Sequence, residues 1–136
     1  MNTKDLGEKS EAKIMSVLLD KGLTVLKPWG DNKRYDFVVE LNGFHRVQCK
    51  TGKLKNGSID FSTKSVTTKN GEYVNVNYRG QADFFMVYCP DNKQVYCVKV
   101  EECGLDGCRL RLEVPKNKQS KGVRLAKDYE LDQVFR

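Results

Sequence analysis

The stretch that decides the fold is residues 34–52, RYDFVVELNGFHRVQCKTG. Its flanks are rich in β-branched and aromatic residues, and the Asn-Gly pair at 42–43 is a turn sequence, so the pattern predicts a hairpin of two antiparallel strands. Each strand nevertheless carries polar residues, with Asp36 on the first and Gln48 and Lys50 on the second. Because side chains alternate across a strand, Gln48 and Lys50 share one face. Apolar residues would be more favourable in a hairpin that enters a core, so these polar positions indicate a site.

The length of the turn determines whether Asp36 joins that face. A two-residue loop at 42–43 would pair Asp36 with Cys49 and place the carboxylate on the opposite face. A three-residue loop at 41–43 would pair Asp36 with Gln48 instead. A type I turn followed by a left-handed glycine produces the longer loop, and its last residue here is glycine. A β-bulge beside the site would correct the register equally well, so we predict one of these two devices.

A face that carries a carboxylate, an amide and an ammonium group is suited to hold a hard cation next to a phosphate. Mg²⁺ accepts carboxylate, amide and main-chain carbonyl oxygens, so the candidate ligands here are Asp36, Gln48 and the backbone carbonyl of Cys49. A metal there would polarise a phosphoryl oxygen and ease the deprotonation of bound water. Lys50 lies about 6–7 Å along the strand from Gln48, where it would position that water or neutralise developing charge.

A helix predicted over about residues 5–21 supplies the fourth candidate. Its apolar residues recur at helical spacing and define one buried face: Ile14, Met15, Leu18 and Leu19. Glu11 stands at the start of that face, so we assign it to the metal site as a ligand or catalytic support. Glu8, one turn earlier, is the second choice. The spacing from Asp5 to Glu8 matches a capping box, and Gly22 is a suitable stop.

The remaining sequence alternates between strands and turns. Strands are predicted over 23–27, 58–62, 83–89, 94–100 and 109–114, with a loop at 52–57, a polar extended stretch within 64–82 and a helix at 126–135. This order indicates an α+β fold with a central mixed β-sheet flanked by helices. The 136 residues contain no internal repeat or low-complexity linker, so residues 1–136 are expected to form a single domain.

Charge favours a polyanionic partner. The chain has 24 Lys and Arg against 18 Asp and Glu, a formal net charge of +6. Contacts of Lys and Arg with phosphates are the main source of sequence-independent affinity for nucleic acid, although the same residues would also serve solubility alone.

The residues expected to contact DNA are Lys53, Lys55, Lys64, Lys69, Tyr78, Arg79, Lys116, Lys118 and Lys121, with Arg124 beside the last three. Phosphate contacts fix the position of a protein on DNA without reading its sequence. For base contacts the candidates are the extended segments within 58–79, because a two-stranded β-ribbon fits the major groove.

The start of the chain, MNTKDLGEKSE, is polar and lacks an apolar signal core. No run approaches the roughly 20 apolar residues of a membrane span, so no membrane association is expected. The five cysteines are odd in number and irregularly spaced. This usage is typical of reduced thiols, and we expect a cytoplasmic protein.

Asp36 followed by Gln48-Cys49-Lys50 resembles the metal site of the PD-(D/E)XK nuclease superfamily, which includes restriction enzymes and archaeal Holliday junction resolvases. A smaller subfamily, the group I intron-encoded homing endonucleases, is resembled in GEKSEAKIMSVLLDKG (7–22), VLKPWGDNKRYDFVV (25–39), RVQCKTG (46–52), YRGQADFFMVY (78–88) and VRLAKDYEL (123–131). The resemblance spans most of the chain in the same order. It implies a restriction-endonuclease-like core and site-specific cleavage of double-stranded DNA with Mg²⁺, or Mn²⁺ as an alternative ion. It also implies a homodimer or homotetramer.

Two positions depart from the superfamily pattern. Tyr35 stands where the superfamily has a proline, and Gln48 stands where it has an acid. An amide removes one negative charge and should weaken Mg²⁺ binding, although Glu11 would restore a carboxylate. Glutamine at this position also resembles the intron-encoded subfamily, which favours the homing type.

Two alternatives stay open from the sequence. A structure-selective nuclease such as a Holliday junction resolvase would share the site and differ in substrate. A non-catalytic DNA-binding protein on the same fold would be consistent with the missing acid at Gln48. Away from the site, Asp83 is expected to have a structural role at the start of its strand. Trp29 is expected to pack beneath the 28–33 loop, with contact to DNA as the alternative.

Overall fold

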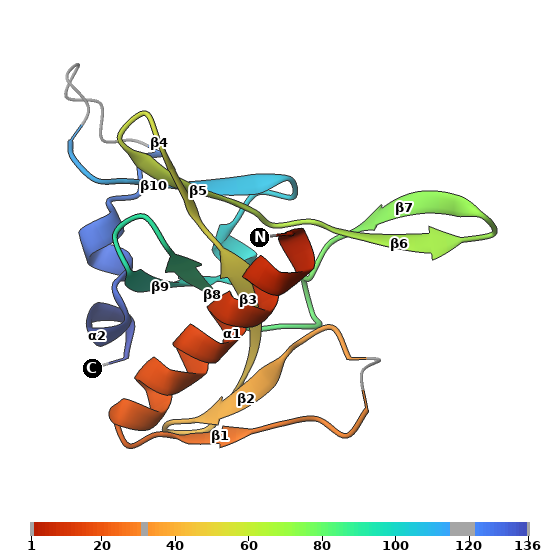
Figure 1. The fold of residues 1–136 in the computed structure, drawn as a ribbon, viewed down its shortest axis with the longest axis horizontal. Helices are drawn as coiled ribbons and strands as arrows, with labels where there is room; N and C mark the ends of the chain where they lie inside the picture. Colours follow the sequence, from red (N-terminus) through yellow and green to blue (C-terminus); the bar gives the residue numbers. More distant parts are fainter. Residues whose placement is uncertain (1, 31–32, 115–121, 136) are drawn as a thin grey trace.

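The computed structural model describes residues 2–30, 33–114 and 122–135, and a five-stranded mixed sheet lies at its centre (Figure 1). The strands in spatial order are β1 (Thr24–Leu26), β2 (Phe37–Glu40), β3 (Phe44–Thr51), β8 (Phe84–Cys89) and β9 (Gln94–Lys99). Neighbouring strands are antiparallel except β3 and β8, which are parallel. The predicted α+β fold with a central mixed sheet is confirmed.

The hairpin of β2 and β3 has the three-residue turn predicted at 41–43, and its paired register runs from Glu40 with Phe44 to Phe37 with Val47, one residue short of Asp36. Glu40 pairs with Phe44, and the amide of Leu41 donates to the carbonyl of Gly43 at 2.9 Å. Asn42 has a φ of 52° and Gly43 a φ of 125°, a value that favours glycine because it has no Cβ. The longer loop therefore sets the register of residues 37–40, whereas the amide of Asp36 lies just outside that ladder and donates to the carbonyl of Val47 at 2.8 Å.

Helix α1 (Thr3–Asp20) covers one face of the central sheet. Ile14 and Leu18 are fully buried in a cluster with sheet residues that include Phe37 and Val47. The helix begins two residues earlier than predicted because Asn2, not Asp5, is its cap, and the Asn2 side chain accepts from the amide of Asp5 at 2.8 Å. Within the described residues, no helix is both long and apolar enough to cross a membrane.

A three-stranded sheet packs on the opposite face, in the order β10 (Gly107–Arg111), β5 (Ser58–Ser62) and β4 (Lys53–Lys55). Ile59 and Phe61 of β5 share a buried cluster with Phe85 and Val87 of β8. The predicted loop at 52–57 is wrong in part, because β4 pairs with β5 there. Asn56 and Gly57 have φ values of 49° and 78°, which suit a two-residue hairpin turn with the twist of its strands.

Strands β6 (Ser65–Lys69) and β7 (Glu72–Val76) form a separate hairpin that extends away from the rest of the molecule (Figure 1). Asn70 and Gly71, with φ values of 54° and 79°, form its tip. The extended stretch predicted within 64–82 is therefore a two-stranded ribbon. Its outward position leaves it accessible to a large partner.

The last part of the described chain forms two short helical turns instead of the single helix predicted. In place of one helix at 126–135, a 3₁₀ turn (Ala126–Tyr129) is followed by the short helix α2 (Leu131–Val134). The two are separated by Glu130, whose backbone is extended and forms an isolated bridge with Tyr96 of β9. Another 3₁₀ turn (Val100–Glu102) follows β9.

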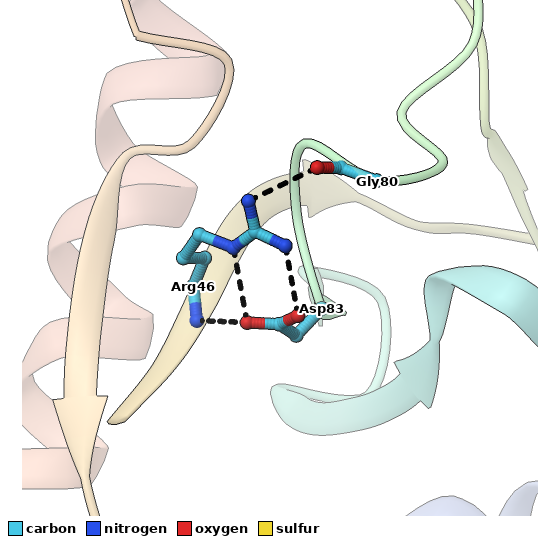
Figure 2. Close-up of polar contacts among 3 residues, drawn as sticks. All are labelled: Arg46, Gly80 and Asp83. Atoms are coloured by element: carbon cyan, nitrogen blue, oxygen red, sulfur yellow. Dashed lines mark hydrogen bonds and ion pairs between the residues drawn. The ribbon is translucent and has the colours of Figure 1, made fainter. Parts of the chain in front are cut away.

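Arg46 and Asp83 join β3 to the start of β8 (Figure 2). The Asp83 carboxylate accepts from the Arg46 amide at 2.7 Å, from Nε at 3.2 Å and from Nη2 at 3.1 Å. Nη1 of the same guanidinium donates to the carbonyl of Gly80 at 3.1 Å. The predicted structural role of Asp83 is confirmed, and the bidentate pair fixes the point where the parallel ladder begins.

Gly52 follows β3 at a point where the two sheets approach each other closely, so a larger residue there should disturb their packing. A Cβ at this position would lie 2.8 Å from Cγ2 of Ile59 and 2.9 Å from Cγ1 of Val87. Gly52→Ala should therefore destabilise the protein by about 1–3 kcal/mol in urea unfolding. Gly7→Ala is the control, since a Cβ at that helical position meets nothing within 4 Å, and it should leave stability equal or raise it. Equal unfolding midpoints for both variants would contradict this packing.

Candidate active site

Asp36 lies where β2 separates from β3. Its amide donates to the carbonyl of Val47 at 2.8 Å, and its carboxylate oxygen Oδ2 accepts from the amide of Cys49 at 2.7 Å. The carboxylate therefore takes the place of a main-chain acceptor that β2 no longer supplies, which satisfies an otherwise unpaired N–H. This hydrogen bond holds the carboxylate at the edge of the sheet.

Glu11 reaches the same place from α1. Its carboxylate accepts from Nζ of Lys27 at 2.7 Å, and the charges of both side chains act on Asp36. Ser10, which is 1% exposed, shares a hydrogen bond of 2.6 Å with the hydroxyl of Thr51 and so fixes the helix against the end of β3. Glu8, the second choice from the sequence, is exposed.

Sequence reasoning missed Lys27 and Ser10. Lys27 is 16 positions from Glu11, and nothing in the local pattern signals their pairing. Ser10 lies one turn before Ile14 on the buried face of the helix, but a serine at that position carries no specific signal.

The carboxyl group of Asp36 has a raised pKa. Burial is the largest cause, and the negative charge of Glu11 raises the pKa further. The hydrogen bond from the Cys49 amide and the charge of Lys27 oppose this, without reversing it. Ionisation of Asp36 next to Glu11 therefore costs free energy, and a cation bound between the two carboxylates would offset that cost.

A cavity of about 210 Å³ lies beside the two acids. It is lined by Glu11, Lys27, Pro28, Gly30, Lys33, Tyr35 and Asp36. Trp29, from the same loop, is 99% exposed, so the prediction that it packs beneath the loop is wrong. An indole in solvent next to an open, charged cavity is available for contact with a partner.

Gln48 and Lys50 lie on β3 and are not among the residues that line this cavity. Nε2 of Gln48 donates to the carbonyl of Cys49 at 3.3 Å, and Nζ of Lys50 donates to the carbonyl of Lys64 at 3.2 Å. The structure thus brings Glu11, Asp36 and Cys49 together. Gln48 is linked to this group only by its hydrogen bond to the Cys49 carbonyl. Lys50 is directed to the segment that precedes β6.

The face that carries Gln48 and Lys50 is less open than the strand pattern suggested. Gln48 pairs with Phe85 and Lys50 with Val87 in the parallel ladder, and both partners are buried. Apolar side chains therefore cover parts of both faces of β3, which the hydrophilic residues alone did not indicate.

The donor set fits a hard divalent ion. In the described part of the chain, no three His, Cys, Asp or Glu side chains gather as a metal site. Any ion at Glu11 and Asp36 would therefore need further oxygen ligands. The candidates are the carbonyl of Cys49, whose amide bonds to Asp36, and the side-chain amide of Gln48, which bonds to that carbonyl. Burial raises the pKa of the Cys49 thiol well above its usual range, so the sulfur stays protonated and the carbonyl is the candidate donor.

The residues predicted to bind DNA are dispersed over several surfaces. Lys53 and Lys55 are exposed and line a groove of about 570 Å³ with Arg109, and Lys64 and Arg79 are exposed elsewhere. Lys69 lies on β6. Lys116, Lys118 and Lys121 fall outside the described residues. Tyr78 is only 5% exposed, so its ring is not available for the DNA contact predicted for it.

Comparison with known proteins agrees with this arrangement. A family model described as PD-(D/E)XK endonuclease matches residues 1–132. Among solved structures, a bacterial homing endonuclease, I-Ssp6803I, is similar with a TM-score of 0.73 and 26% sequence identity, over 96% of this chain and 89% of that chain. Comparison with curated proteins gave no match. Both similarities extend over the elements that carry Glu11, Asp36 and Lys50.

Asp36→Asn should raise the free energy of unfolding at neutral pH. Because the pKa of Asp36 is raised in the folded protein, the fold favours the protonated carboxyl. Its ionisation therefore costs stability at every pH above the folded pKa, and this cost disappears below the unfolded value of 3.8. Unfolding in urea from pH 7 down to about pH 4 should show a gain for Asp36→Asn that shrinks with acidification.

Asp83→Asn is the control of opposite sign. The hydrogen bond and charge of Arg46 lower the pKa of Asp83, so its stabilisation is present above 3.8 and is lost as the pH falls through the folded pKa. This variant should lose stability at pH 7. If Asp36→Asn were the less stable of the two at neutral pH, the assigned electrostatics of the site would be wrong.

Proposed function

Because the chain belongs to the PD-(D/E)XK endonuclease family, we propose that it is a Mg²⁺-dependent, site-specific endonuclease of double-stranded DNA, of the homing type. Mn²⁺ is expected to substitute for Mg²⁺. The observation that carries the proposal is the pairing of Glu11 and Asp36 around one cavity, next to the strand that bears Gln48 and Lys50. Similarity to a homing endonuclease over 96% of the chain supports the homing type.

Glu11, Asp36, the Gln48 amide oxygen and the Cys49 carbonyl would hold the ion. When bound, a divalent metal polarises a phosphoryl oxygen and makes water a better nucleophile. Rotation of the Gln48 amide away from the Cys49 carbonyl would direct its oxygen to the ion and free that carbonyl. A neutral amide in place of an acid leaves the site with two carboxylates, so binding of Mg²⁺ should be weak without DNA phosphates.

Lys50 is proposed to orient the attacking water and to stabilise the charge of the pentavalent phosphorus state. A positioned ammonium is effective there because charge increases on the phosphoryl oxygens as the bond to water forms. In-line attack on the phosphodiester would leave a 5′-phosphate and a 3′-hydroxyl. Lys50 would have to leave the carbonyl of Lys64 to reach the phosphate.

DNA would be held by the exposed cations and read by the ribbon of β6 and β7. Lys53 and Lys55 beside a groove suit backbone phosphates, and the ribbon has the width of a major-groove element. One such site cuts one strand, so cutting both strands requires a homodimer or homotetramer whose symmetry matches a near-palindromic target.

Lys50→Ala should abolish cleavage and spare binding. Supercoiled plasmid, linear duplex and a four-way junction, each with Mg²⁺ or Mn²⁺, are the substrates to compare. The variant should lose at least about 100-fold in rate, because removal of a group that acts on the transition state reduces kcat, while its Kd for DNA changes little. No cleavage of any substrate by the wild type would favour a DNA-binding protein, and cleavage of junctions alone a structure-selective nuclease.

Lys27→Met should strengthen binding of the divalent ion. The Lys27 ammonium is a resident counter-ion for Glu11, and an incoming metal must compete with it. Titration with Mn²⁺, followed by isothermal calorimetry, should give a several-fold lower Kd for Lys27→Met. Lys33→Met, which alters another lysine of the same cavity, is the matched control and should change the Kd less. Weaker Mn²⁺ binding by Lys27→Met would mean that the ammonium supports the site instead.

A further inference from the structure

Tyr78 lies between the β6–β7 ribbon and the central sheet. It follows the end of β7 by two residues, and its ring is 5% exposed. The ring packs edge-to-face on Phe85 of β8, with 5.4 Å between ring centroids and 87° between planes. This contact fixes the ring on the same face of the sheet as Lys50, whose Nζ lies 5.9 Å from the Phe85 ring.

Two cations share the Tyr78 ring. The Cζ atom of Arg34 lies 4.4 Å from the ring centroid, and Nζ of Lys50 lies 4.9 Å from it. Arg34 lies in the segment that leads into β2, two residues before Asp36, and Lys50 is on β3, so one ring contacts both segments that carry candidate site residues. The electron-rich face of an aromatic ring attracts a cation, and the attraction is stronger where water is excluded.

The same two cations hold the two legs of the ribbon. Nη2 of Arg34 donates to the carbonyls of Val76 at 3.0 Å and Asn77 at 3.3 Å, where the chain leaves β7. Nζ of Lys50 donates to the carbonyl of Lys64 at 3.2 Å, where the chain enters β6. Each leg of the ribbon is thus bonded to a side chain from a segment that carries a candidate site residue, the bend before β2 or β3 itself.

The charge of Arg34 indicates that its contacts with the Tyr78 ring and with the end of β7 do more than fill space in the core. Its Nε atom is buried and, within the described structure, has no hydrogen-bond partner. A buried unpaired donor is costly, so the face of the Tyr78 ring and the two carbonyls must offset that cost. An apolar residue of similar size would fill the space without this cost, and a guanidinium therefore indicates a role in holding the base of the ribbon.

We propose that Tyr78 is a positioning residue that couples DNA bound on the β6–β7 ribbon to the placement of Lys50. Its ring holds Arg34 and Lys50 at the base of the ribbon, so a shift of the legs on DNA changes the contact between Lys50 and the carbonyl of Lys64. The ammonium is then free to turn toward the scissile phosphate. This inference rests on the proposed nuclease function, and it adds a link between recognition and chemistry.

The kinetic test compares Tyr78→Phe with Tyr78→Leu. Phenylalanine keeps the ring and should cleave supercoiled plasmid with Mn²⁺ at the wild-type rate. Leucine keeps an apolar side chain without a π face, so its kcat should fall about tenfold while its KM and its Kd for plasmid stay within about twofold. Tyr129→Leu, a tyrosine packed against the same core cluster, is the control for general loosening and should keep its kcat.

A spectroscopic test observes the wild-type protein and needs a variant only to assign one signal. A methylene next to an ammonium above a ring is shielded, so the ε-methylene protons of Lys50 should resonate upfield of the other lysines in the wild-type protein. Lys50→Arg assigns the signal. Addition of a 30-base-pair duplex with Ca²⁺, which should bind without supporting cleavage, should move the signal downfield.

Three results would overturn the inference. These are an unshielded Lys50 signal in the wild type, equal kcat values for Tyr78→Leu and wild type, and an equal loss in Tyr78→Phe and Tyr78→Leu. A wild type that cuts no DNA would remove the proposed function and this inference together. A wild type that cuts DNA, with any of the three results, would remove the inference alone.

Discussion

The hydrogen bond from the Cys49 amide to the Asp36 carboxylate is the interaction on which the rest of the site depends. It forms because β2 begins only at Phe37, after Asp36, and so leaves the Cys49 amide of β3 without a main-chain partner, which the Asp36 carboxylate supplies. Helix α1, tied to β3 by Ser10 and Thr51, then brings Glu11 to the same cavity. The fold therefore assembles two carboxylates from elements that are separated in sequence.

The local parts of this arrangement could be predicted from the sequence. The three-residue turn at 41–43 was one of the two devices predicted, and Gly43 has the positive φ of 125° that such a turn requires of its last residue. Glu11 followed from its place at the start of the buried face of α1. The alternation of β2 and β3 identified the face of Gln48 and Lys50, because a period of two is a property of any strand.

The parts that depend on long-range packing could not be predicted. Lys27 pairs with Glu11 through the tertiary fold, and Tyr78, which looked like a surface residue in a polar segment, is buried because Phe85 receives its ring. Strand β4 was missed because its residues, Lys53-Leu54-Lys55, are mostly polar, although Asn56-Gly57 gave a turn signal. Trp29 was expected to pack beneath the 28–33 loop and is in solvent, next to the cavity. Each of these errors concerns a residue of, or near, the proposed DNA-binding and catalytic surfaces.

The central claim is that Glu11 and Asp36 form one binding site for a divalent ion. The most direct measurement is the anomalous diffraction of a crystal of the wild-type protein soaked in Mn²⁺. An anomalous peak is expected within about 2.0–2.3 Å of a carboxylate oxygen of each residue, the range of hard-cation bonds to oxygen. A peak that contacts neither residue would contradict this site. So would well-ordered Glu11 and Asp36 side chains with no peak at saturating Mn²⁺, where Glu11 keeps its ion pair with Lys27.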